Sequence, residues 1–396
     1  MRTTIIHLNV ADFAAAVEIV LDSRLSGRPL IVVAGASRVY DMNEAAYRMG
    51  VRKHMSIAAA RRRCRDATVV LSRPDRYARA MQEMVKRAAA FTPRVEPGDT
   101  DGHLFLDVTG TGRLHGSALD VAWRLRRQMR SDLGIDPIWS VAPSKRVAKT
   151  ATRLVKPSGE YVVAEGEEAR FLADLPLEIV AGFEAEDIAK LRSLHLVRPR
   201  DIARLSGDVL EDVFGSRASY IRDVILGIDA SPVRSLDEAP AAIRLEKGFD
   251  PDTEDPQWVE GGLFSLVERA GAEIRRMGLS ASMVSVRLTY ADGGTIVRRF
   301  SCKPATAIDA RLFEAARSAL SLCWCRRIRI RHIVLTCSKL VFPSTQLPLF
   351  EDPLEARQSR LCAVIDTIRS RFGRGMLMTG RGMAEAVYTA SCPLIL

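Results

Sequence analysis

The end of the first apolar segment is the first place where a residue type could do chemistry. Residues 5–8 read IIHL and are followed by Asn9, a polar turn and a stretch rich in Ala and Val. Chains with this pattern often end the strand on a carboxylate that holds a metal, because Mg²⁺ prefers anionic oxygen ligands. The amide oxygen of Asn9 is neutral and is a weaker ligand. Asn9 is therefore either an ordinary turn residue or the remnant of a catalytic site.

Four aspartates offer a different way to bind a metal ion. Asp99 and Asp101 fall on one side of the segment EPGDTDGHLFLDV if that segment is extended. Asp12 and Asp107 could join them, although Asp107 also suits a purely structural role in its strand. A rearranged carboxylate site is thus an alternative to a lost one.

The charge balance is basic, with 58 Lys and Arg against 48 Asp and Glu and a formal net charge of +10. This indicates either a solvated basic surface or a polyanionic partner, of which nucleic acid is the commonest. No run of about 18 apolar residues occurs, so no membrane span is expected. Only Cys323 and Cys325 lie close together among the cysteines, which favours reduced thiols in a cytoplasmic protein over a zinc site.

The first 165 residues predict a mixed α/β region that positions Asn9 and the aspartates. A third helix of this region should open at Ser117, where Asp120 completes a capping box. Residues 166–235 instead predict short helices joined by tight turns. The other elements expected in the first region are strands at residues 5–8, 29–34, 103–108 and 138–141 and helices at about 12–23 and 76–90.

Residues 240–341 predict a small α+β sandwich with helices at about 259–277 and 310–322 on one face of a sheet. Asp292-Gly293-Gly294 joins strands at 283–290 and 295–302, as is typical of a hairpin. Alternation in RIRIRHIVL would place three arginines on the open face, together with Arg287 and with Arg298 or Arg299 from the hairpin. Such a face suits a duplex backbone, although it could also serve only solubility. The three arginines are Arg327, Arg329 and Arg331.

Several runs in a fixed order resemble the Y-family, or translesion, DNA polymerases: IIHLNVADFAAAVE, GVRKHMSIAAARRRC, RVEPGDTDGHLFLDVTG and VAPSKRVAKTATRLVKPSG. The resemblance covers about residues 1–340 and is greatest to the ImuB branch found in mutagenesis cassettes. It implies an α+β multidomain fold, a polymerase-like right hand followed by a little-finger sandwich. The implied parts are palm and fingers at 1–165 (fingers at about 18–75), helical thumb at 166–235, little finger at 240–341 and a C-terminal tail at 342–396.

The resemblance implies a place for the two metal ions of the polymerase reaction, and the residues there depart from the family pattern. Asn9 takes the position of the first aspartate. The family's Asp-Glu pair falls on a hairpin that is one residue longer here. In one register Asp101 and Gly102 take the pair's positions, and in the other Gly102 and His103 do. Neither register gives Asp followed by Glu, so no catalytic residue is expected and these positions are degenerate.

Residues that would face an incoming nucleotide have also changed. Ala14 takes the position of the aromatic steric gate that excludes ribonucleotides. Glu44 and Tyr47 take the positions of the family's triphosphate-binding Tyr and Arg, and Glu44 would repel a triphosphate. Lys156 is the clearest nucleotide-side residue that is retained, and we expect it to contact DNA or nucleotide.

A short peptide after the sandwich resembles the segment by which bacterial polymerases dock on the sliding clamp. It consists of Gln346, Leu347, Pro348, Leu349 and Phe350. The polar Gln would fix the register, while the last two side chains would fill an apolar pocket. The following residues, RLCAVIDTIRSRFGRGMLM, resemble the tail of UmuC-type members and predict an amphipathic helix. This helix would either bind a partner or dock on its own protein.

These features predict a catalytically silent Y-family protein that acts as a DNA-bound, clamp-docked adaptor in error-prone translesion synthesis and damage-induced mutagenesis. The implied partners are primer–template DNA, the bacterial sliding clamp, a RecA-like accessory protein and an error-prone replicative-type polymerase, without a cofactor or a membrane. The expected location is the cytoplasm, in association with the nucleoid. One alternative is an active polymerase with a rearranged Mg²⁺ site. Another is a general DNA-binding protein, against which the clamp-like peptide argues.

Overall fold

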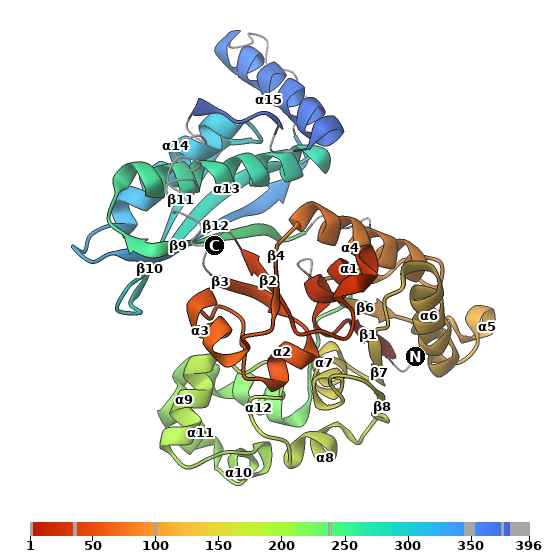
Figure 1. Ribbon diagram of the computed structural model, residues 1–396. Coiled ribbons are helices and arrows are strands. Elements are labelled where there is room, and N and C mark those ends of the chain that lie inside the picture. The colour runs from red at the N-terminus through yellow and green to blue at the C-terminus, as the bar shows by residue number, and fades with distance from the viewer. Residues whose placement is uncertain are drawn as a thin grey trace. The chain divides into compact units, whose positions relative to one another are not determined.

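The computed structural model describes residues 3–34, 38–98, 101–236, 238, 240–343, 353–373 and 376–380. The chain divides into two compact units, Met1–Glu238 and Ala239–Leu396, and Figure 1 shows the elements of each. No helix within the described segments is long and apolar enough to cross a membrane.

The first unit is built around a five-stranded sheet in the order β5-β6-β1-β7-β8. Its central strand is antiparallel to both of its neighbours, β6 and β7. Every residue of β1 and β7 is buried, as expected for strands that are covered on both faces. The strands are β1 (Ile5–Asn9), β5 (Val95–Pro97), β6 (His103–Asp107), β7 (Ile138–Ala142) and β8 (Glu160–Val162).

Alternation along β1 sends its side chains to two different layers. Ile6 and Leu8 pack in one apolar core with α1 (Phe13–Leu21), α4 (Pro74–Ala89) and α6 (Ala118–Leu133). Ile5 instead packs with α7 (Lys145–Leu154) on the other face. Because strand side chains alternate, His7 and Asn9 share this second face with Ile5. The chemistry-bearing residues of β1 therefore lie on the α7 side of the sheet.

A smaller three-stranded sheet in the order β3-β2-β4 and a set of short helices complete the first unit. The predicted capping box of Ser117 and Asp120 is confirmed at the start of α6. The segment after β8 is helical, as the sequence predicted. The elements are β2 (Leu30–Ala34), β3 (Arg38–Met42), β4 (Thr68–Leu71), α2 (Glu44–Arg48), α3 (Ile57–Arg63), α5 (Gly112–His115), α8 (Glu168–Ala173), α9 (Ala185–Ser193), α10 (Pro199–Ala203), α11 (Gly207–Phe214) and α12 (Ala218–Leu226).

The second unit is an antiparallel sheet in the order β11-β10-β12-β9, and two helices pack on one of its faces. The predicted hairpin is confirmed as the pair β10–β11. Sequence periodicity did not reveal the edge strand β9, which is interrupted by polar residues. The elements are β9 (Ala242–Thr253), α13 (Pro256–Arg276), β10 (Ser280–Tyr290), β11 (Thr295–Thr306), α14 (Asp309–Cys323) and β12 (Ile330–Val341).

The strict alternation predicted for RIRIRHIVL is wrong. Strand β12 begins only at Ile330, so Arg327 and Arg329 precede it. The register of its pairing then shifts between Ile330 and His332 against both neighbours, by a β-bulge against β10 and by a larger irregularity against β9. As a result Ile330 and Ile333 both point into the core, although they are three residues apart. A bulge depends on two neighbouring strands, so the segment alone could not reveal it.

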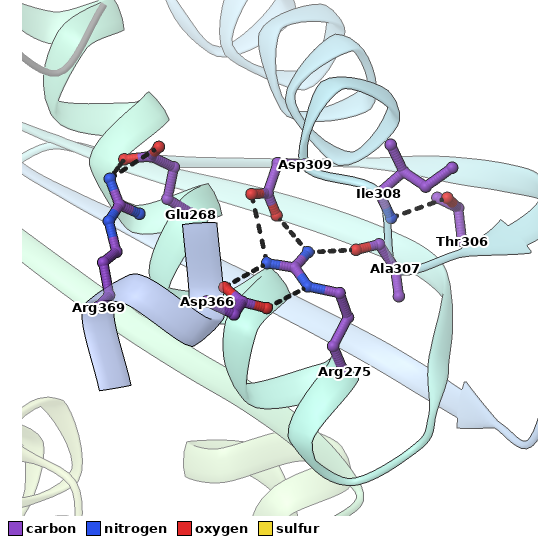
Figure 2. A network of polar contacts seen from close by, with 8 residues as sticks. All are labelled: Glu268, Arg275, Thr306, Ala307, Ile308, Asp309, Asp366 and Arg369. Carbon is purple, nitrogen blue, oxygen red and sulfur yellow. Dashed lines mark hydrogen bonds and ion pairs between the residues drawn. The ribbon is translucent and has the colours of Figure 1, made fainter. Parts of the chain in front are cut away.

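A C-terminal helix, α15 (Pro353–Phe372), docks on the second unit's own helices (Figure 2). Arg275 on α13 forms ion pairs with Asp309 on α14, at 2.6 Å, and with Asp366 on α15, at 2.7 Å. The structure thus shows docking on the same protein, one of the two roles considered for this helix.

Candidate active site and nucleic-acid interface

The residues predicted to mark the altered metal site meet at one end of the central sheet. Asn9 ends β1 and is paired with His103 on β6. The Val10 N–H donates to the carbonyl of Gly102 at 3.0 Å. The Asp101 carboxylate accepts a hydrogen bond from the His103 N–H at 3.1 Å. Both registers considered for the hairpin therefore place their residues beside Asn9.

The Asn9 side chain is buried without a hydrogen-bond partner. The residue is 1% exposed, and neither its amide oxygen nor its amide nitrogen has a partner among the described residues. An unpaired buried polar group costs about 1–3 kcal/mol. Packing alone does not account for an amide at this position, so we treat it as part of a site.

The hairpin at Gly102 leaves no room for a carboxylate. Gly102 has a φ of +78°, and a Cβ atom there would lie 2.9 Å from the Cβ of Phe13. A side chain would meet both a disfavoured backbone conformation and a steric clash. The second carboxylate position of the family is thus closed by the local fold in the first register.

Two histidines, the buried His7 and the half-buried His103, lie on the same face of the sheet. His7 Nδ1 lies 2.7 Å from the Thr152 hydroxyl, and His7 Nε2 lies 3.0 Å from His103 Nδ1. Burial lowers the pKa of His7 well below its usual value, and burial with the charges of Lys149 and Lys156 lowers the pKa of His103 to about 3. Both rings are therefore neutral near neutral pH and supply no charge to a metal.

Three cations from α7 and the loop after it lower the pKa values of the two histidines by their charge. Desolvation lowers the pKa of each of them, Lys149, Arg153 and Lys156. The Arg153 guanidinium donates to the carbonyl of Ile179 at 3.2 Å. No described carboxylate lies within ion-pair distance of any of the three. Sequence reasoning singled out Lys156 but missed the other two, which the helical spacing of α7 brings to the same side.

Asp107 and Asp101, two of the aspartates considered for a rearranged site, have different settings. One oxygen of Asp107 pairs with Arg94 at 3.1 Å, and the other accepts the Thr109 N–H at 2.9 Å. These contacts give Asp107 a structural role at the end of β6. Asp101 lies in the exposed hairpin. Asp99 lies outside the described residues.

Asp12, at the start of α1, belongs to an acidic group with residues of β3 and α2. Burial and the nearby carboxylates of Asp41 and Glu44 raise the pKa of Asp12 to about 6. Asp41 is buried, accepts the Ala14 N–H at 2.9 Å and pairs with Lys53 at 2.9 Å. Ala14, which we expect at the position of the steric gate, thus has a short side chain and a backbone N–H that donates to a buried carboxylate.

The two positions expected to hold triphosphate in the family have other local partners. Glu44 pairs with Arg48 at 2.8 Å, one turn along α2. The Arg52 guanidinium lies 3.9 Å from the centre of the Tyr47 ring. Neither residue offers a cation to a nucleotide.

These donors do not fit a Mg²⁺ site. In the described part of the chain no group of three or more His, Cys, Asp or Glu side chains could hold a metal ion. Mg²⁺ requires oxygen ligands, usually carboxylates. The end of β1 instead offers the neutral amide of Asn9 and the neutral ring of His103, close to several cations.

The open face of the second unit's sheet carries a row of residues that crosses all four strands. Arg299 pairs with Ser285, Ser285 with Thr336, and Thr336 with Arg244. Both arginines are exposed, and Arg287 lies on the same face one row away. We call Arg244, Arg287 and Arg299 the sheet-face arginines. Arg244 was missed because its strand was not predicted.

Two further arginines predicted to line this face have different local settings. Arg298 pairs across the hairpin with Val286, whose side chain is in the core, so Arg298 points to the helix side of the edge strand. Arg331 lies at the bulge of β12 and forms an ion pair with Asp252 at 3.0 Å. Of Arg298 and Arg299, which the prediction left as alternatives, Arg299 is therefore the one on the face of Arg287.

Comparison with known proteins agrees with this architecture. Residues 8–153 match the impB/mucB/samB family, and residues 241–349 match the impB/mucB/samB family C-terminal domain. The chain belongs to the Y-family of DNA polymerases.

Relatives in this Y-family match nearly the whole chain. DNA polymerase IV of Desulfatibacillum aliphaticivorans is 31% identical over 94% of this chain and 94% of its own length. DNA polymerase IV of Dehalococcoides mccartyi strain CBDB1 is 29% identical over 95% of this chain and 97% of its own. A Y-family chimera of Dbh and Dpo4 superimposes with a TM-score of 0.69 at 21% identity, over 86% of this chain and 100% of its own. The predicted right-hand fold with a little-finger sandwich is thereby confirmed.

The clamp-like peptide of this Y-family chain, residues 346–350, lies outside the described residues. It stays a prediction from the sequence, and its role is taken up below.

Proposed function

We propose that this Y-family protein binds primer–template DNA without catalysing synthesis and acts as an adaptor in error-prone translesion synthesis, as in the ImuB branch. One observation carries the proposal. The strand end that would hold the metal ions presents a buried neutral amide, a glycine without space for a side chain and neutral histidines close to cations that no described carboxylate pairs.

The physical argument concerns charge at the reacting centre. Phosphoryl transfer to a primer needs two divalent ions that activate the attacking hydroxyl and neutralise the developing charge. Cations near the same strand end oppose the binding of a divalent ion, and the amide of Asn9 contributes no negative charge. Losing preorganised electrostatic groups of this kind commonly costs several kcal/mol of transition-state stabilisation.

Binding to DNA is supported by two basic regions that need no metal ion. In the first unit, Lys156 and the neighbouring cations of α7 offer contacts to phosphates. In the second unit, the sheet-face arginines lie exposed on one face of the sheet, which suits the backbone of a duplex. We propose that the units correspond to palm, fingers and thumb at 1–165 and 166–235, and to little finger and tail at 240–341 and 342–396.

The adaptor role also requires partners. We propose that residues 346–350 dock on the bacterial sliding clamp, and that a RecA-like accessory protein and an error-prone replicative-type polymerase, which performs the synthesis, join the complex. The protein would then act in the cytoplasm at the nucleoid during damage-induced mutagenesis. These partners follow from the resemblance to the ImuB branch and from the clamp-like peptide.

A second candidate function is DNA-directed DNA synthesis with a rearranged Mg²⁺ site. It is favoured by the relatives named DNA polymerase IV, which match 94–95% of this chain. Asp12 and Asp101 are the described carboxylates that such a site would use.

Primer extension distinguishes the two functions. We expect the purified protein, with all four deoxynucleotides and either Mg²⁺ or Mn²⁺, to leave a primer–template unextended. The matched control is the Asp101→Ala variant, which removes a carboxylate of the rearranged site. If the wild type extended the primer in a template-dependent way and Asp101→Ala did not, the protein would be an active polymerase and the adaptor proposal would be wrong.

Clamp docking is tested by the double change Leu349→Ala and Phe350→Ala. Burying each side chain supplies roughly 1.5–3 kcal/mol, and a short peptide has few other anchors, so we expect the variant to lose clamp association in a pull-down. Binding to short DNA should be retained. In cells the variant should lose damage-induced mutagenesis. Undiminished clamp association would mean that another surface makes the contact.

A further inference from the structure

A pocket lies beside the loop that joins α14 to β12 in the second unit. Its volume is about 420 Å³, within the range of about 300–1,000 Å³ that is typical of small-molecule sites. The loop contains the Cys-Trp-Cys run and Arg327, none of which lies in the sheet-face row described above. Six residues line the pocket: Glu254, Trp324, Cys325, Arg326, Arg327 and Ile328.

Two of the three charged residues in this pocket are unpaired. Arg326 forms an ion pair with Asp292 at 2.6 Å and lies 5.1 Å from the centre of the Tyr290 ring, so its charge is neutralised within the hairpin. Glu254 and Arg327 are exposed, and neither forms an ion pair with any described residue or with the other. The pocket therefore offers a carboxylate and a guanidinium at separate places, beside the aromatic ring of Trp324.

From this arrangement we infer that the pocket binds an unpaired guanine base, which stacks on Trp324 and is recognised by Glu254 and Arg327. Guanine has two adjacent donors, N1–H and the N2 amino group, which match the two oxygens of a carboxylate. Its O6 and N7 atoms are the acceptors that arginine commonly contacts. Adenine, cytosine and thymine do not present two adjacent donors. Because base pairing occupies N1 and N2, the site accepts guanine only from single-stranded DNA or from a free guanine nucleotide.

The opposite charges of the pocket argue against simpler ligands. A phosphate would be repelled by Glu254, and a metal ion or an amine would be repelled by Arg327. An apolar group would remove water from both charges without replacing it, which is unfavourable. A nucleobase avoids these penalties, because it is neutral and carries donors and acceptors along its edge. Its flat face also stacks on an aromatic side chain, as in proteins that bind single strands.

Hydrogen bonds to the hairpin hold the loop in place before a ligand arrives. The Tyr290 hydroxyl donates to the carbonyl of Cys323 at 2.6 Å, at the end of α14. The Ala291 N–H donates to the carbonyl of Arg329 at 2.8 Å, just before β12. The loop is thus tied at both ends, and Trp324 packs partly against the apolar core. A site that is already ordered loses less conformational entropy when it binds.

The inference goes beyond the proposed function, because recognition of a base at this pocket requires neither a metal ion nor synthesis. A guanine site in the second unit would let the protein hold the unpaired part of a template, whereas the sheet-face arginines suit the duplex part.

The test is fluorescence anisotropy with short labelled oligo(dT) strands that carry guanine, hypoxanthine, adenine or thymine at the centre. A second arm measures the binding of GMP and AMP by calorimetry. We expect the wild type to bind the guanine strand roughly ten-fold more tightly than the thymine strand, as expected for hydrogen bonds to a charged group. Hypoxanthine lacks the N2 amino group, so its strand should bind with intermediate affinity.

The deciding variant is Glu254→Gln, which should bind all four strands with similar affinity. Glu254 is exposed, so we expect the variant to keep the wild-type midpoint of urea unfolding. The matched control is Glu314→Gln, which removes the same charge from an exposed position on α14 and should keep the preference for guanine. Trp324→Ala should weaken the binding of every strand, whereas Trp324→Phe should retain it, because stacking requires a ring rather than a particular base.

The outcomes separate the two sources of guanine. A preference seen only among the strands assigns single-stranded DNA, tighter binding of GMP than of AMP alone assigns a free nucleotide, and both together assign a site that needs only the base. Equal affinities in both arms overturn the inference and leave a protein segment as the other occupant of the pocket. An unchanged preference in Glu254→Gln overturns it as well. Primer extension by the wild type would contradict the proposed function, whatever these affinities are.

Discussion

Two cationic clusters, one in each unit, differ in whether the protein supplies the opposite charge. In the second unit, Arg275 is 17% exposed and lies between Asp309 and Asp366 (Figure 2). Although burial alone would lower its pKa, hydrogen bonds to the two aspartates raise it. In the first unit, the pKa values of Lys149 and Arg153 are lowered, because desolvation acts without such a partner among the described residues.

The difference separates a structural role from a binding role. Arg275 joins three helices, α13, α14 and α15, and its charge is neutralised within the folded chain. Lys149 and Arg153 pair with no described residue of opposite charge, so the folded chain tolerates an electrostatic cost at this place. A cost that packing does not explain is commonly retained at functional sites. Removing the cation of the second unit should therefore lower stability, whereas removing a cation of the first unit should weaken ligand binding.

The largest effect is expected from Arg275→Ala. The change leaves Asp309 and Asp366 as unpaired carboxylates in a partly buried place, which commonly costs about 3–5 kcal/mol. We expect a lower midpoint of urea unfolding for the second unit and faster hydrogen exchange in α15.

The control is Arg276→Ala, which removes an exposed neighbouring arginine on the same helix. It should leave both the unfolding midpoint and the hydrogen exchange of α15 unchanged. If the two variants were equally stable, α15 would be held by apolar contacts. The structural role assigned to Arg275 would then be wrong.

A second, smaller effect is expected from acidification of the first unit. His7 and His103 have lower pKa values in the folded chain than in the unfolded chain. Below pH about 6.5 the unfolded chain therefore binds more protons, and stability falls as the pH falls. Each proton contributes a slope of about 1.4 kcal/mol per pH unit. Asp12, whose pKa is raised to about 6, opposes this slope between that value and its usual 3.8.

The measurement is the free energy of urea unfolding from pH 7 to pH 5, compared between the wild type and His103→Asn. The variant should show a shallower fall, because one proton fewer is taken up on unfolding. His195→Asn changes an exposed histidine with a φ of +58°, a conformation that Asn tolerates, and should keep the wild-type slope. Equal slopes for all three proteins would mean that His103 is not neutral in the fold.

The sequence predicted an altered site at Asn9 but not which residues surround it. The strand end at Asn9 and the retained Lys156 could be predicted, because both depend on short local patterns. The role of Lys149 could not be predicted, since it depends on how α7 crosses the sheet and on which described carboxylates come near it. The closed space at Gly102 likewise depends on Phe13, which lies far away along the chain.

The second unit shows the same limit. Its hairpin followed from the turn residues and from alternation, and its two helices from their apolar periodicity. The bulge of β12 and the edge strand β9 followed from neither, because both depend on pairing between strands. The sequence therefore predicted that arginines lie on this sheet, but which face each one occupies follows only from the register of the paired strands.

Exposed cations form a third class, and the replacement of each one should have the smallest effect, here on DNA affinity. Solvent screens them, so they stabilise a DNA complex mainly through the release of counterions. Replacing the sheet-face arginines with Gln should weaken binding to a primer–template and reduce the log–log salt slope by about 0.9 for each phosphate that the variant no longer neutralises. Fluorescence anisotropy over a range of salt concentrations measures both quantities.

The matched variant replaces Arg327, Arg329 and Arg331, which removes the same charge from the second unit. Two of these residues precede β12, and the third is paired with Asp252 at 3.0 Å. We therefore expect this variant to lose less affinity and less salt slope than the sheet-face variant. A larger loss from this second variant would favour the surface predicted from alternation over the row of residues that the strand register defines. It would also mean that an exposed arginine can bind DNA even when it pairs with an aspartate of the same chain. The presence or absence of an ion-pair partner would then distinguish structural from binding roles only for desolvated cations.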